Sequence, residues 1–238
     1  MKKLPKMSLN SSVFYALPYQ ALKWEVLKTA IELDVFSQLA EPSTSEAIAA
    51  KLSTHAANTE YLLNALVALG CLSKTDGYFR NTPLAETFLI PEEETSIGQS
   101  LLFVESWICP VLNGRMKDLV RNGPPPPQPI GSDETWEAGA RVSLNEKRGG
   151  RAQRMAGRIA ALPEFPTFKR VLDMGAGPGL IGVATTIEHP SLECVLFDQP
   201  AVCRVADEVI AEYGLADRVT TIPGDYMSDQ AKRGFRMP

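Results

Sequence analysis

The first seventy residues show apolar positions at helical spacing. Residues 18–40 place four apolar side chains on one helical face: Leu22, Val26, Ala30 and Leu33. A run of hydroxyl residues at 43–45 predicts the start of a shorter helix that continues to residue 52. Residues 58–69 predict a third helix, and its leucines are expected to be buried: Leu62, Leu63, Leu66 and Leu69.

A hairpin is expected directly after the third helix. Gly70 is a natural helix end, and the segment CLSKTDGYFRNTP predicts two short strands around Asp76-Gly77. Three helices followed by a hairpin are typical of a winged helix, and winged helices often bind DNA. Residues 57–70 contain no Lys or Arg, however, and residues 1–100 carry 8 basic against 11 acidic side chains. Because phosphate contacts supply most non-specific DNA affinity, a packing or dimerisation module is favoured.

The middle of the chain predicts helices separated by a proline-rich connector. Residues 96–121 have a helical pattern, which Asn122-Gly123 and the prolines of 124–129 end. We interpret this proline run as a stiff connector in preference to a polyproline ligand for a partner. Residues 135–162 predict one long helix, and a solvated basic face is favoured over an anion site for its four arginines: Arg148, Arg151, Arg154 and Arg158.

From residue 168 onward the pattern changes to alternating strands and helices. Short apolar strands are expected at 169–173, 192–197 and 218–222. Helical segments at 180–188 and 201–213 separate them. This β-α-β-α-β order is the first half of a doubly wound parallel sheet.

The glycines after the first of these strands indicate the kind of ligand. Gly175, Gly177 and Gly179 form G-x-G-x-G, which differs from the G-x-G-x-x-G spacing of dinucleotide sites. Asp173 stands two positions before the first glycine, where a carboxylate would repel a pyrophosphate but attract the ammonium of an amino-acid group. Glycines at these positions let the backbone approach a ligand without an intervening Cβ.

Acidic residues also follow the next two strands. Asp198 lies 25 residues after Asp173, and its carboxylate can accept hydrogen bonds from both ribose hydroxyls. Asp225 can accept from an adenine amino group, while Tyr226 and Met227 offer apolar surface to the ring. The three strand ends together predict a site for S-adenosylmethionine or its product.

Composition excludes several other classes of protein. The 238 residues are 45% hydrophobic and 22% charged with a net charge of −4, so no basic footprint for nucleic acid or an anionic membrane is expected. No apolar run approaches 18 residues. The four cysteines and two histidines are scattered, which predicts no metal site and reduced thiols in a cytoplasmic protein.

Three segments carry a resemblance to a known family: VLDMGAGPGLIGVA, VLFDQPAV and DRVTTIPGDYM. They resemble the small-molecule, S-adenosylmethionine-dependent O-methyltransferases of the plant phenolic and hydroxyindole type, over about residues 12–229. The resemblance implies a Rossmann-like class I methyltransferase domain of the α/β class, preceded by a mainly helical winged-helix dimerisation domain. It also implies a homodimer, a small-molecule acceptor with a hydroxyl group, and S-adenosylmethionine as cofactor.

The resemblance also implies roles for individual residues. Asp173 and Gly175 would serve the methionine end of the cofactor, and Asp198 its ribose. The adenine would be framed by Gly224, Asp225 and Tyr226. Candidates for the acceptor pocket are Trp107, Trp136 and Met155, for which ordinary core packing is the competing interpretation.

The sequence departs from this family's pattern at its C-terminal end. We expect a dimerisation domain at 1–100, linker helices at 101–165 and a partial cofactor domain at 166–238, with only the first three of about seven strands. The basic tail at 230–238 is interpreted as the result of a truncation or of a shifted reading frame. Strand 168–173 is expected to be an unpaired edge strand. The segment in which the family places its catalytic histidine is absent.

No catalytic residue can be assigned from the sequence. Neither His55 nor His189 is expected to reach an acceptor hydroxyl, so methyl transfer by this chain alone is expected to be weak or absent. Two other functions stay open. One is a catalytically dead dimerisation or regulatory partner of a full-length methyltransferase, and the other is a winged-helix DNA regulator.

Overall fold

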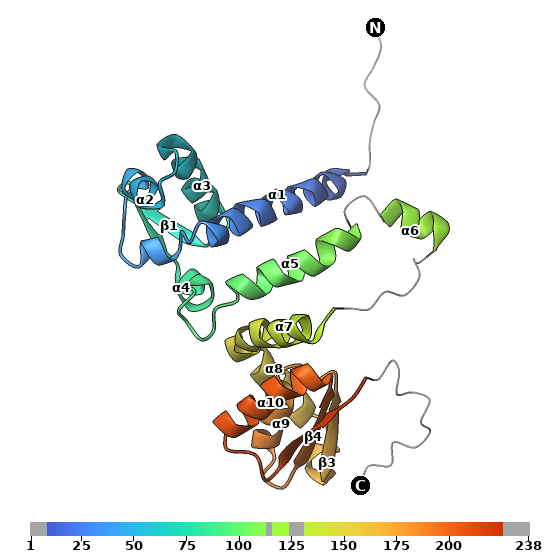
Figure 1. The fold of residues 1–238 in the computed structure, drawn as a ribbon. Coiled ribbons are helices and arrows are strands. Elements are labelled where there is room, and N and C mark those ends of the chain that lie inside the picture. The colour runs from blue at the N-terminus through green and yellow to red at the C-terminus, as the bar shows by residue number, and fades with distance from the viewer. Residues whose placement is uncertain (1–8, 113–115, 124–130, 226–238) are drawn as a thin grey trace. The chain divides into compact units, whose positions relative to one another are not determined.

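The computed structural model describes residues 9–112, 116–123 and 131–225, with the side chains of 107–112 left aside. Contacts between residues divide the chain into two compact units, Met1–Glu93 and Glu94–Pro238. Each unit has its own secondary structure and its own core, and they are described in turn (Figure 1).

The first unit is helical with one hairpin. Its elements in chain order are α1 (Ser12–Glu32), the 3-10 turn η1 (Ser37–Leu39), α2 (Ser45–Leu52), α3 (Ala56–Ala68), β1 (Leu72–Thr75), β2 (Tyr78–Asn81) and α4 (Pro83–Leu89). The predicted order of three helices and a hairpin is confirmed, whereas α4 was not predicted.

Local sequence signals explain where these elements begin and turn. The Thr44 side chain accepts a hydrogen bond from the Ala47 amide and caps α2, as the hydroxyl run predicted. Asp76 and Gly77 both have positive φ, 51° and 83°, which is the geometry of a type I′ hairpin turn. The antiparallel strands therefore pair from Thr75 opposite Tyr78 outward.

The core of the first unit lies between its helices and the hairpin. Leu63 and Leu66 of α3 are fully buried, together with Phe36, Ile48 and Phe79. The expected burial of Leu62 and Leu69 is only partly met, since both lie at the half-buried flank of α3. The buried stripe of α3 follows Thr59, Leu63 and Leu66, and Leu62 and Leu69 lie beside it on one side.

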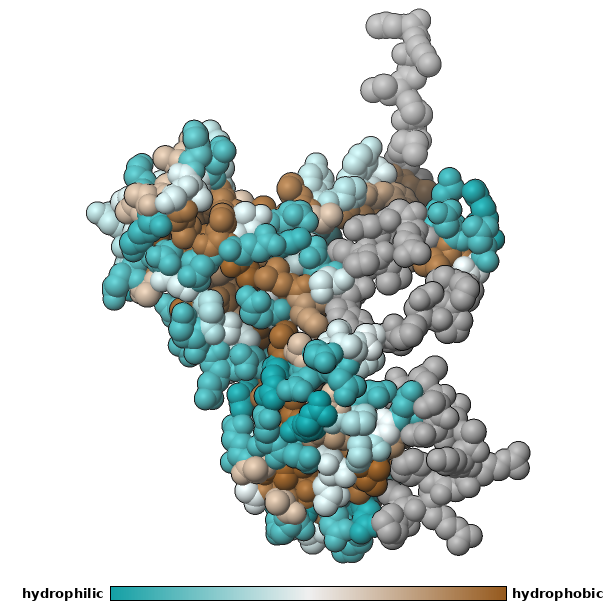
Figure 2. All heavy atoms as spheres, viewed as in Figure 1, coloured by the Kyte–Doolittle hydropathy of each residue, from teal (hydrophilic) through white to brown (hydrophobic). Residues whose placement is uncertain are grey.

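Helix α1 exposes apolar side chains along its first half. Figure 2 shows hydrophobic side chains along this helix, and the exposed set includes Val13, Phe14, Leu17 and Leu22. Toward its end the helix turns inward, where Ala30 is fully buried. An exposed apolar helix face of this kind is characteristic of a surface that another protein covers.

The second unit contains a parallel sheet and the helices that cover it. Its elements are α5 (Gly98–Leu112), α6 (Met116–Asn122), α7 (Asp133–Glu146), the π-turn η2 (Lys147–Arg151), α8 (Ala152–Ala160), the 3-10 turn η3 (Phe165–Thr167), β3 (Arg170–Met174), α9 (Leu180–Glu188), β4 (Glu193–Asp198), α10 (Pro200–Glu212) and β5 (Val219–Pro223).

The three strands form a parallel sheet in the order β3-β4-β5. Both crossover helices pack on one face of it, because α9 and α10 share a buried cluster with β4 that includes Val183, Leu196 and Val209. The sheet confirms the predicted β-α-β-α-β half of a doubly wound fold. Within the part of the chain that the structure describes, β3 is an edge strand, as expected.

One predicted helix is divided, since the segment 135–162 is broken at η2. The predicted helix at 96–121 is met by α5 and α6, and residues 113–115 between them lie outside the described residues. Gly149 and Gly150 have non-helical backbone angles in η2, with φ of 98° at Gly150, so the chain bends between α7 and α8. The prediction of one long helix was therefore wrong, because it followed the arginine spacing and passed over the glycine pair.

Candidate functional site

The glycine turn after β3 is fastened to the end of β4. The amide of Gly175 donates to the Phe197 carbonyl at 2.9 Å. The amide of Gly177 donates to the carboxylate Oδ2 of Asp198 at 2.7 Å. Both glycines have positive φ, which lets the turn follow this path. Two strand ends that are distant in sequence thus form one continuous polar surface.

The three glycines of the motif differ in what surrounds them. A Cβ added to Gly175 would meet no atom within 4 Å, and one added to Gly177 would approach only the Lys147 side chain. A Cβ added to Gly179 would collide with Leu196 of β4 and crowd Ala206 of α10. Gly179 therefore lets α9 pack closely on the sheet, a role that the idea of ligand approach did not anticipate.

Asp198 uses both carboxylate oxygens to hold the backbone. Besides the Gly177 amide on Oδ2, its Oδ1 accepts the Gln199 amide at 2.7 Å, at the start of α10. Each oxygen of an ionised carboxylate has two acceptor positions, so each keeps one for a further donor. The carboxylate is held rigidly and still has the capacity to bind a ligand's hydroxyl groups.

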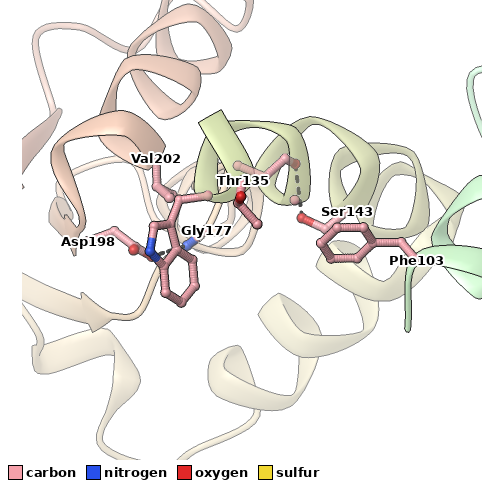
Figure 3. A pocket seen from close by; sticks show the side chains of 9 residues that line it. Phe103, Thr135, Ser143, Gly177, Asp198 and Val202 are labelled. Atoms are coloured by element: carbon pink, nitrogen blue, oxygen red, sulfur yellow. Dashed lines mark hydrogen bonds between the residues drawn. The ribbon is translucent and has the colours of Figure 1, made fainter. Parts of the chain in front are cut away.

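A cavity of about 250 Å³ opens beside this carboxylate (Figure 3). Its lining is mostly apolar and comes from α5, α7, the glycine turn and the β4–α10 junction: Phe103, Thr135, Trp136, Gly139, Ala140, Ser143, Gly177, Asp198 and Val202. Gly139 allows the Phe103 ring to approach α7, because an added Cβ would lie 2.9 Å from it. The volume is below the ~300–1,000 Å³ usual for small-molecule sites, so a ligand of nucleoside size would extend beyond this cavity.

The residues that the sequence suggested for the site differ in their position relative to this cavity. Gly177, Asp198 and Trp136 line it. Met155 is half-buried on α8 and is not among the lining residues. The side chain of Trp107 lies outside the described residues. Sequence reasoning missed Phe103, Thr135, Ser143 and Val202, whose residue types carry no specific signal.

The third strand end joins the same edge of the sheet. The Gly224 amide donates to the Asp198 carbonyl at 2.9 Å, directly after β5. Asp225 follows it and is half-buried. Tyr226 lies outside the described residues. The structure thus brings the ends of β3, β4 and β5 together at one edge, as parallel pairing requires.

Two groups of opposite charge lie near the glycine turn: Asp173 near the end of β3, and Lys147, whose side chain approaches Gly177. Burial raises the pKa of Asp173 above its ordinary value, with the nearby Asp198 carboxylate acting in the same direction and Lys147 opposing it. Burial lowers the pKa of Lys147, while Glu146, Asp173 and Asp198 partly oppose this shift. Lys147 was not identified from the sequence, although the Gly149-Gly150 pair that follows it is a visible signal of a break.

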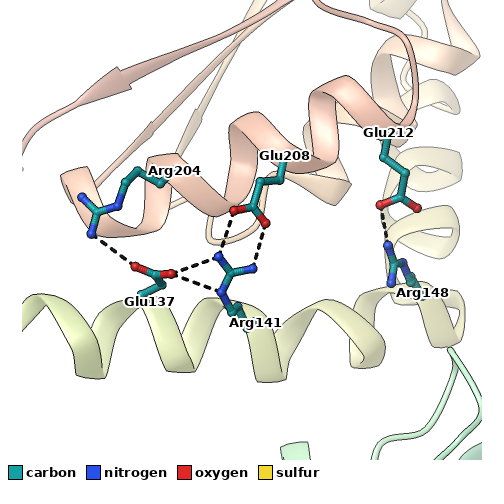
Figure 4. A network of polar contacts seen from close by, with 6 residues as sticks. All are labelled: Glu137, Arg141, Arg148, Arg204, Glu208 and Glu212. Atoms are coloured by element: carbon teal, nitrogen blue, oxygen red, sulfur yellow. Dashed lines mark hydrogen bonds and ion pairs between the residues drawn. The ribbon is translucent and has the colours of Figure 1, made fainter.

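An ion-pair network holds α7 against α10 (Figure 4). Arg141 binds Glu208 through two hydrogen bonds of 2.8 and 2.9 Å and also binds Glu137 at 2.9 Å. Arg204 contacts Glu137 at 3.2 Å, and Arg148 contacts Glu212 at 2.6 Å. The network orients the helix that carries Trp136. The predicted solvated arginine face is confirmed for Arg151, Arg154 and Arg158, which are exposed, and is wrong for Arg148, which is only 19% exposed and paired.

Neither histidine has a position that suggests chemistry at this cavity. His55 caps α3 in the first unit, where its Nδ1 accepts the Asn58 amide at 3.4 Å. His189 follows α9 beside Phe165 and Pro166, at the edge where β3 and β4 begin.

Among the described residues there is no group of three or more His, Cys, Asp or Glu suited to a metal ion. No described helix is long and apolar enough to cross a membrane.

Two family descriptions match the chain. The O-methyltransferase dimerisation domain matches residues 17–91, and the O-methyltransferase domain matches residues 136–233. The chain belongs to the O-methyltransferase family. The first match falls within the helical unit, and the second begins within α7 and includes the whole of the described sheet.

Individual relatives of the O-methyltransferase family agree with this assignment. The chain is 29% identical to 3-hydroxy-5-methyl-1-naphthoate 3-O-methyltransferase from Streptomyces sahachiroi, over 89% of its length and 62% of that protein. It is 27% identical to phenazine O-methyltransferase PhzM from Lysobacter antibioticus, over 84% of its length and 60% of that protein. The chain thus spans about three fifths of the length of these relatives.

A solved structure shares the fold. The structure described as "PigF with SAH", a Serratia protein, superposes with a TM-score of 0.75 at 23% identity, covering 92% of this chain and 68% of that one. The class I methyltransferase fold is therefore present, with an N-terminal helical unit and a partial Rossmann-like sheet of three described strands.

Proposed function

We propose that this chain binds S-adenosylmethionine at the ends of β3, β4 and β5 and belongs to an enzyme that methylates a hydroxyl group of a small molecule. The observation that carries the proposal is Asp198. Its carboxylate is fixed by the Gly177 amide at 2.7 Å, lines an apolar cavity, and keeps acceptor capacity for a diol. Ribose hydroxyls are such a diol.

The remaining residues of the site fit the cofactor as well. The space beside Gly175 is open, so a ligand can contact the backbone of the turn. Asp173 offers a half-buried carboxylate for an ammonium group, and Asp225 stands at the third strand end for an adenine amino group. Trp136 and Val202 supply apolar surface to the cavity. These are complementary to the chemical parts of an adenosyl amino acid.

The residues of this chain would mainly bind and orient. S-adenosylmethionine, when bound, supplies a methyl group on an electrophilic sulfonium. Phe103 and Trp136 would exclude water on the α5–α7 side of the cavity, and a flat aromatic acceptor fits their apolar surface. The names of two relatives describe methylation of a naphthoate and of a phenazine, which supports an aromatic acceptor. Trp107 and Met155 remain candidates for contacts with it.

We also propose a homodimer that forms through the first unit in the cytoplasm. The match to a dimerisation domain supports the dimer, as does the apolar face of α1 with Phe14 and Leu17 exposed. The described cysteines, Cys71, Cys194 and Cys203, are unbridged and buried, which is consistent with a reducing compartment.

Calorimetric titration with S-adenosylhomocysteine tests the proposed site. We expect binding by the chain as it stands, and a loss of affinity of between about 10-fold and about 100-fold in Asp198→Ala, because hydrogen bonds to a charged group are removed. The matched control is Asp217→Ala, an exposed aspartate outside the cavity, which should bind as the unchanged chain does. Equal affinities for both variants would refute the assignment of Asp198.

An assay of a labelled methyl donor with aromatic hydroxyl acceptors then distinguishes an active methyltransferase from a regulatory partner that lacks activity. Methyl transfer that Asp198→Ala abolishes supports the enzyme. Binding of S-adenosylhomocysteine without transfer, together with co-purification of a longer relative, is the result expected of the regulatory partner.

A further inference from the structure

Lys147 lies at the glycine turn and comes from a different part of the chain. It is the first residue of η2, where α7 ends and the Gly149-Gly150 bend begins. A Cβ built on Gly177 would lie 3.6 Å from the Lys147 Nζ, so the ammonium lies directly against the turn. Its Nζ donates to the Ser143 Oγ at 3.3 Å, and Ser143 lines the cavity described above. The bend after Lys147 places the ammonium at the site.

Lys147 and Asp173 carry opposite charges near the glycine turn, and they do not form an ion pair with each other. Lys147 lies against Gly177, and Asp173 stands near the end of β3, two residues before Gly175. Each acts on the ionisation of the other. Both side chains are half-buried, and burial disfavours the charged form of each. Within a protein, charges so placed are ordinarily paired. A ligand that carries both signs would compensate both charges.

We propose that Lys147 binds the carboxylate of the amino-acid part of S-adenosylmethionine, opposite Asp173, which takes its ammonium. This inference rests on the proposed function and adds a specificity determinant to it. A zwitterion between the two side chains satisfies both charges at once, which neither achieves alone. Ser143 acts as a positioning residue, because its hydroxyl holds the Lys147 ammonium toward the cavity.

The neighbouring basic residues do not share this position. Arg148 is paired with Glu212 on α10, and Arg151 with Glu146. Arg151 is 55% exposed and lies on the same turn, so it serves as a matched control. Of the three successive basic side chains in Lys147-Arg148-Gly149-Gly150-Arg151, Lys147 is the one that lies against the glycine turn.

Two ligands that differ by one carboxylate test the inference. S-adenosylhomocysteine has the complete amino-acid group, and its decarboxylated analogue keeps the ammonium and the nucleoside. We expect the unchanged chain to prefer S-adenosylhomocysteine in calorimetric titrations. Lys147→Met should weaken its binding by about 10-fold or more, the loss expected for a charge-assisted hydrogen bond, and change the affinity for the analogue by less than about 2-fold. Arg151→Met should leave both affinities unchanged.

The pattern of affinities separates the failure of this inference from that of the proposed function. If Lys147→Met keeps the original preference for S-adenosylhomocysteine, or loses affinity for both ligands equally, Lys147 does not recognise the carboxylate. Binding of either ligand by the unchanged chain would still support the cofactor site. If the unchanged chain binds neither ligand, the proposed function itself is wrong. Both ligands are measured on the same variant. A partly unfolded fraction would lower the binding of both ligands equally, so it cannot account for a loss that is confined to S-adenosylhomocysteine.

Discussion

Polar groups in the core of the first unit and the charges beside the glycine turn of the second unit differ in their partners. In the first unit, Thr59 bonds both the Thr54 hydroxyl at 2.6 Å and the His55 carbonyl at 3.0 Å, and Asn81 donates to the Phe36 carbonyl at 2.9 Å. In the second unit, Asp173 and Lys147 are half-buried and not joined in an ion pair. Polar groups that bond their own chain stabilise the fold, whereas half-buried charges that burial disfavours, and that neighbouring charges offset only in part, are candidates for contact with a ligand.

The largest effect is expected from a substitution in the core of the first unit. Leu63→Ala removes a fully buried side chain and should lower the free energy of unfolding by about 2–5 kcal/mol. Because the cofactor contacts lie in the second unit, affinity for S-adenosylhomocysteine should change by less than about 2-fold. Thermal denaturation and calorimetry on the same sample measure both. Tyr61→Ala, at a position 71% exposed on the same helix, is the control.

A parallel loss of cofactor affinity and stability in Leu63→Ala would break the distinction between the units. It would mean that the cofactor site needs the first unit to keep its shape. Unchanged affinity would locate the site wholly in the second unit.

A smaller effect is expected from Asp173→Asn, which should raise the stability of the ligand-free chain and lower its affinity for S-adenosylhomocysteine. Since burial raises its pKa above 3.8, the folded chain binds this proton more tightly, and stability falls as pH rises from about 3.8 through the raised value. Asp173→Asn removes the unfavourable burial of a charged carboxylate. The ligand-free variant should therefore be more stable at neutral pH and lose this part of its pH dependence. Its affinity for S-adenosylhomocysteine should fall about 10-fold, because an ammonium loses its carboxylate.

Thermal melts between pH 3.5 and pH 7, with and without ligand, check the Asp173 prediction. Lower stability of Asp173→Asn without ligand would show that this carboxylate stabilises the fold, as the polar groups of the first unit do. Asp217→Asn, at an exposed position, is the matched control.

The smallest effect is expected in the ion-pair network between α7 and α10. Arg141→Met removes the bonds to Glu208 and Glu137, which are exposed and therefore screened by salt. The melting temperature should fall slightly at low ionic strength, and the difference should vanish near 1 M salt. Arg158→Met, an exposed arginine on α8, should show no salt-dependent difference. A loss that persists at high salt would show that Arg141 acts through packing.

Sequence patterns predicted the alternating strands and helices well because each signal was local. The Asp76-Gly77 turn needs only two residues with positive φ, and each strand of the sheet is a short run with an acidic residue within two positions of its end. The break at Gly149-Gly150 was missed because helical spacing of arginines continues through it.

The site was predictable only where its residues follow a strand. Asp198 and Gly177 were found because parallel strands end at one edge, so their order in the sequence determines their place. Lys147 reaches the same turn from a helix 30 residues earlier than Gly177, and nothing in its local sequence specifies that contact. Trp136 was named from the resemblance, while Phe103 depends on how α5 packs against α7.

The crowding at Gly179 has a consequence for how such motifs are interpreted. A substitution there would force Leu196 out of its place even in a chain that never meets a nucleoside, whereas Gly175 faces open space. Intolerance to replacement at the third glycine therefore reports on folding. A protein could lose its chemistry and still need the third glycine for folding, so tests of lost activity should be aimed at Asp173, the acidic residue before the turn.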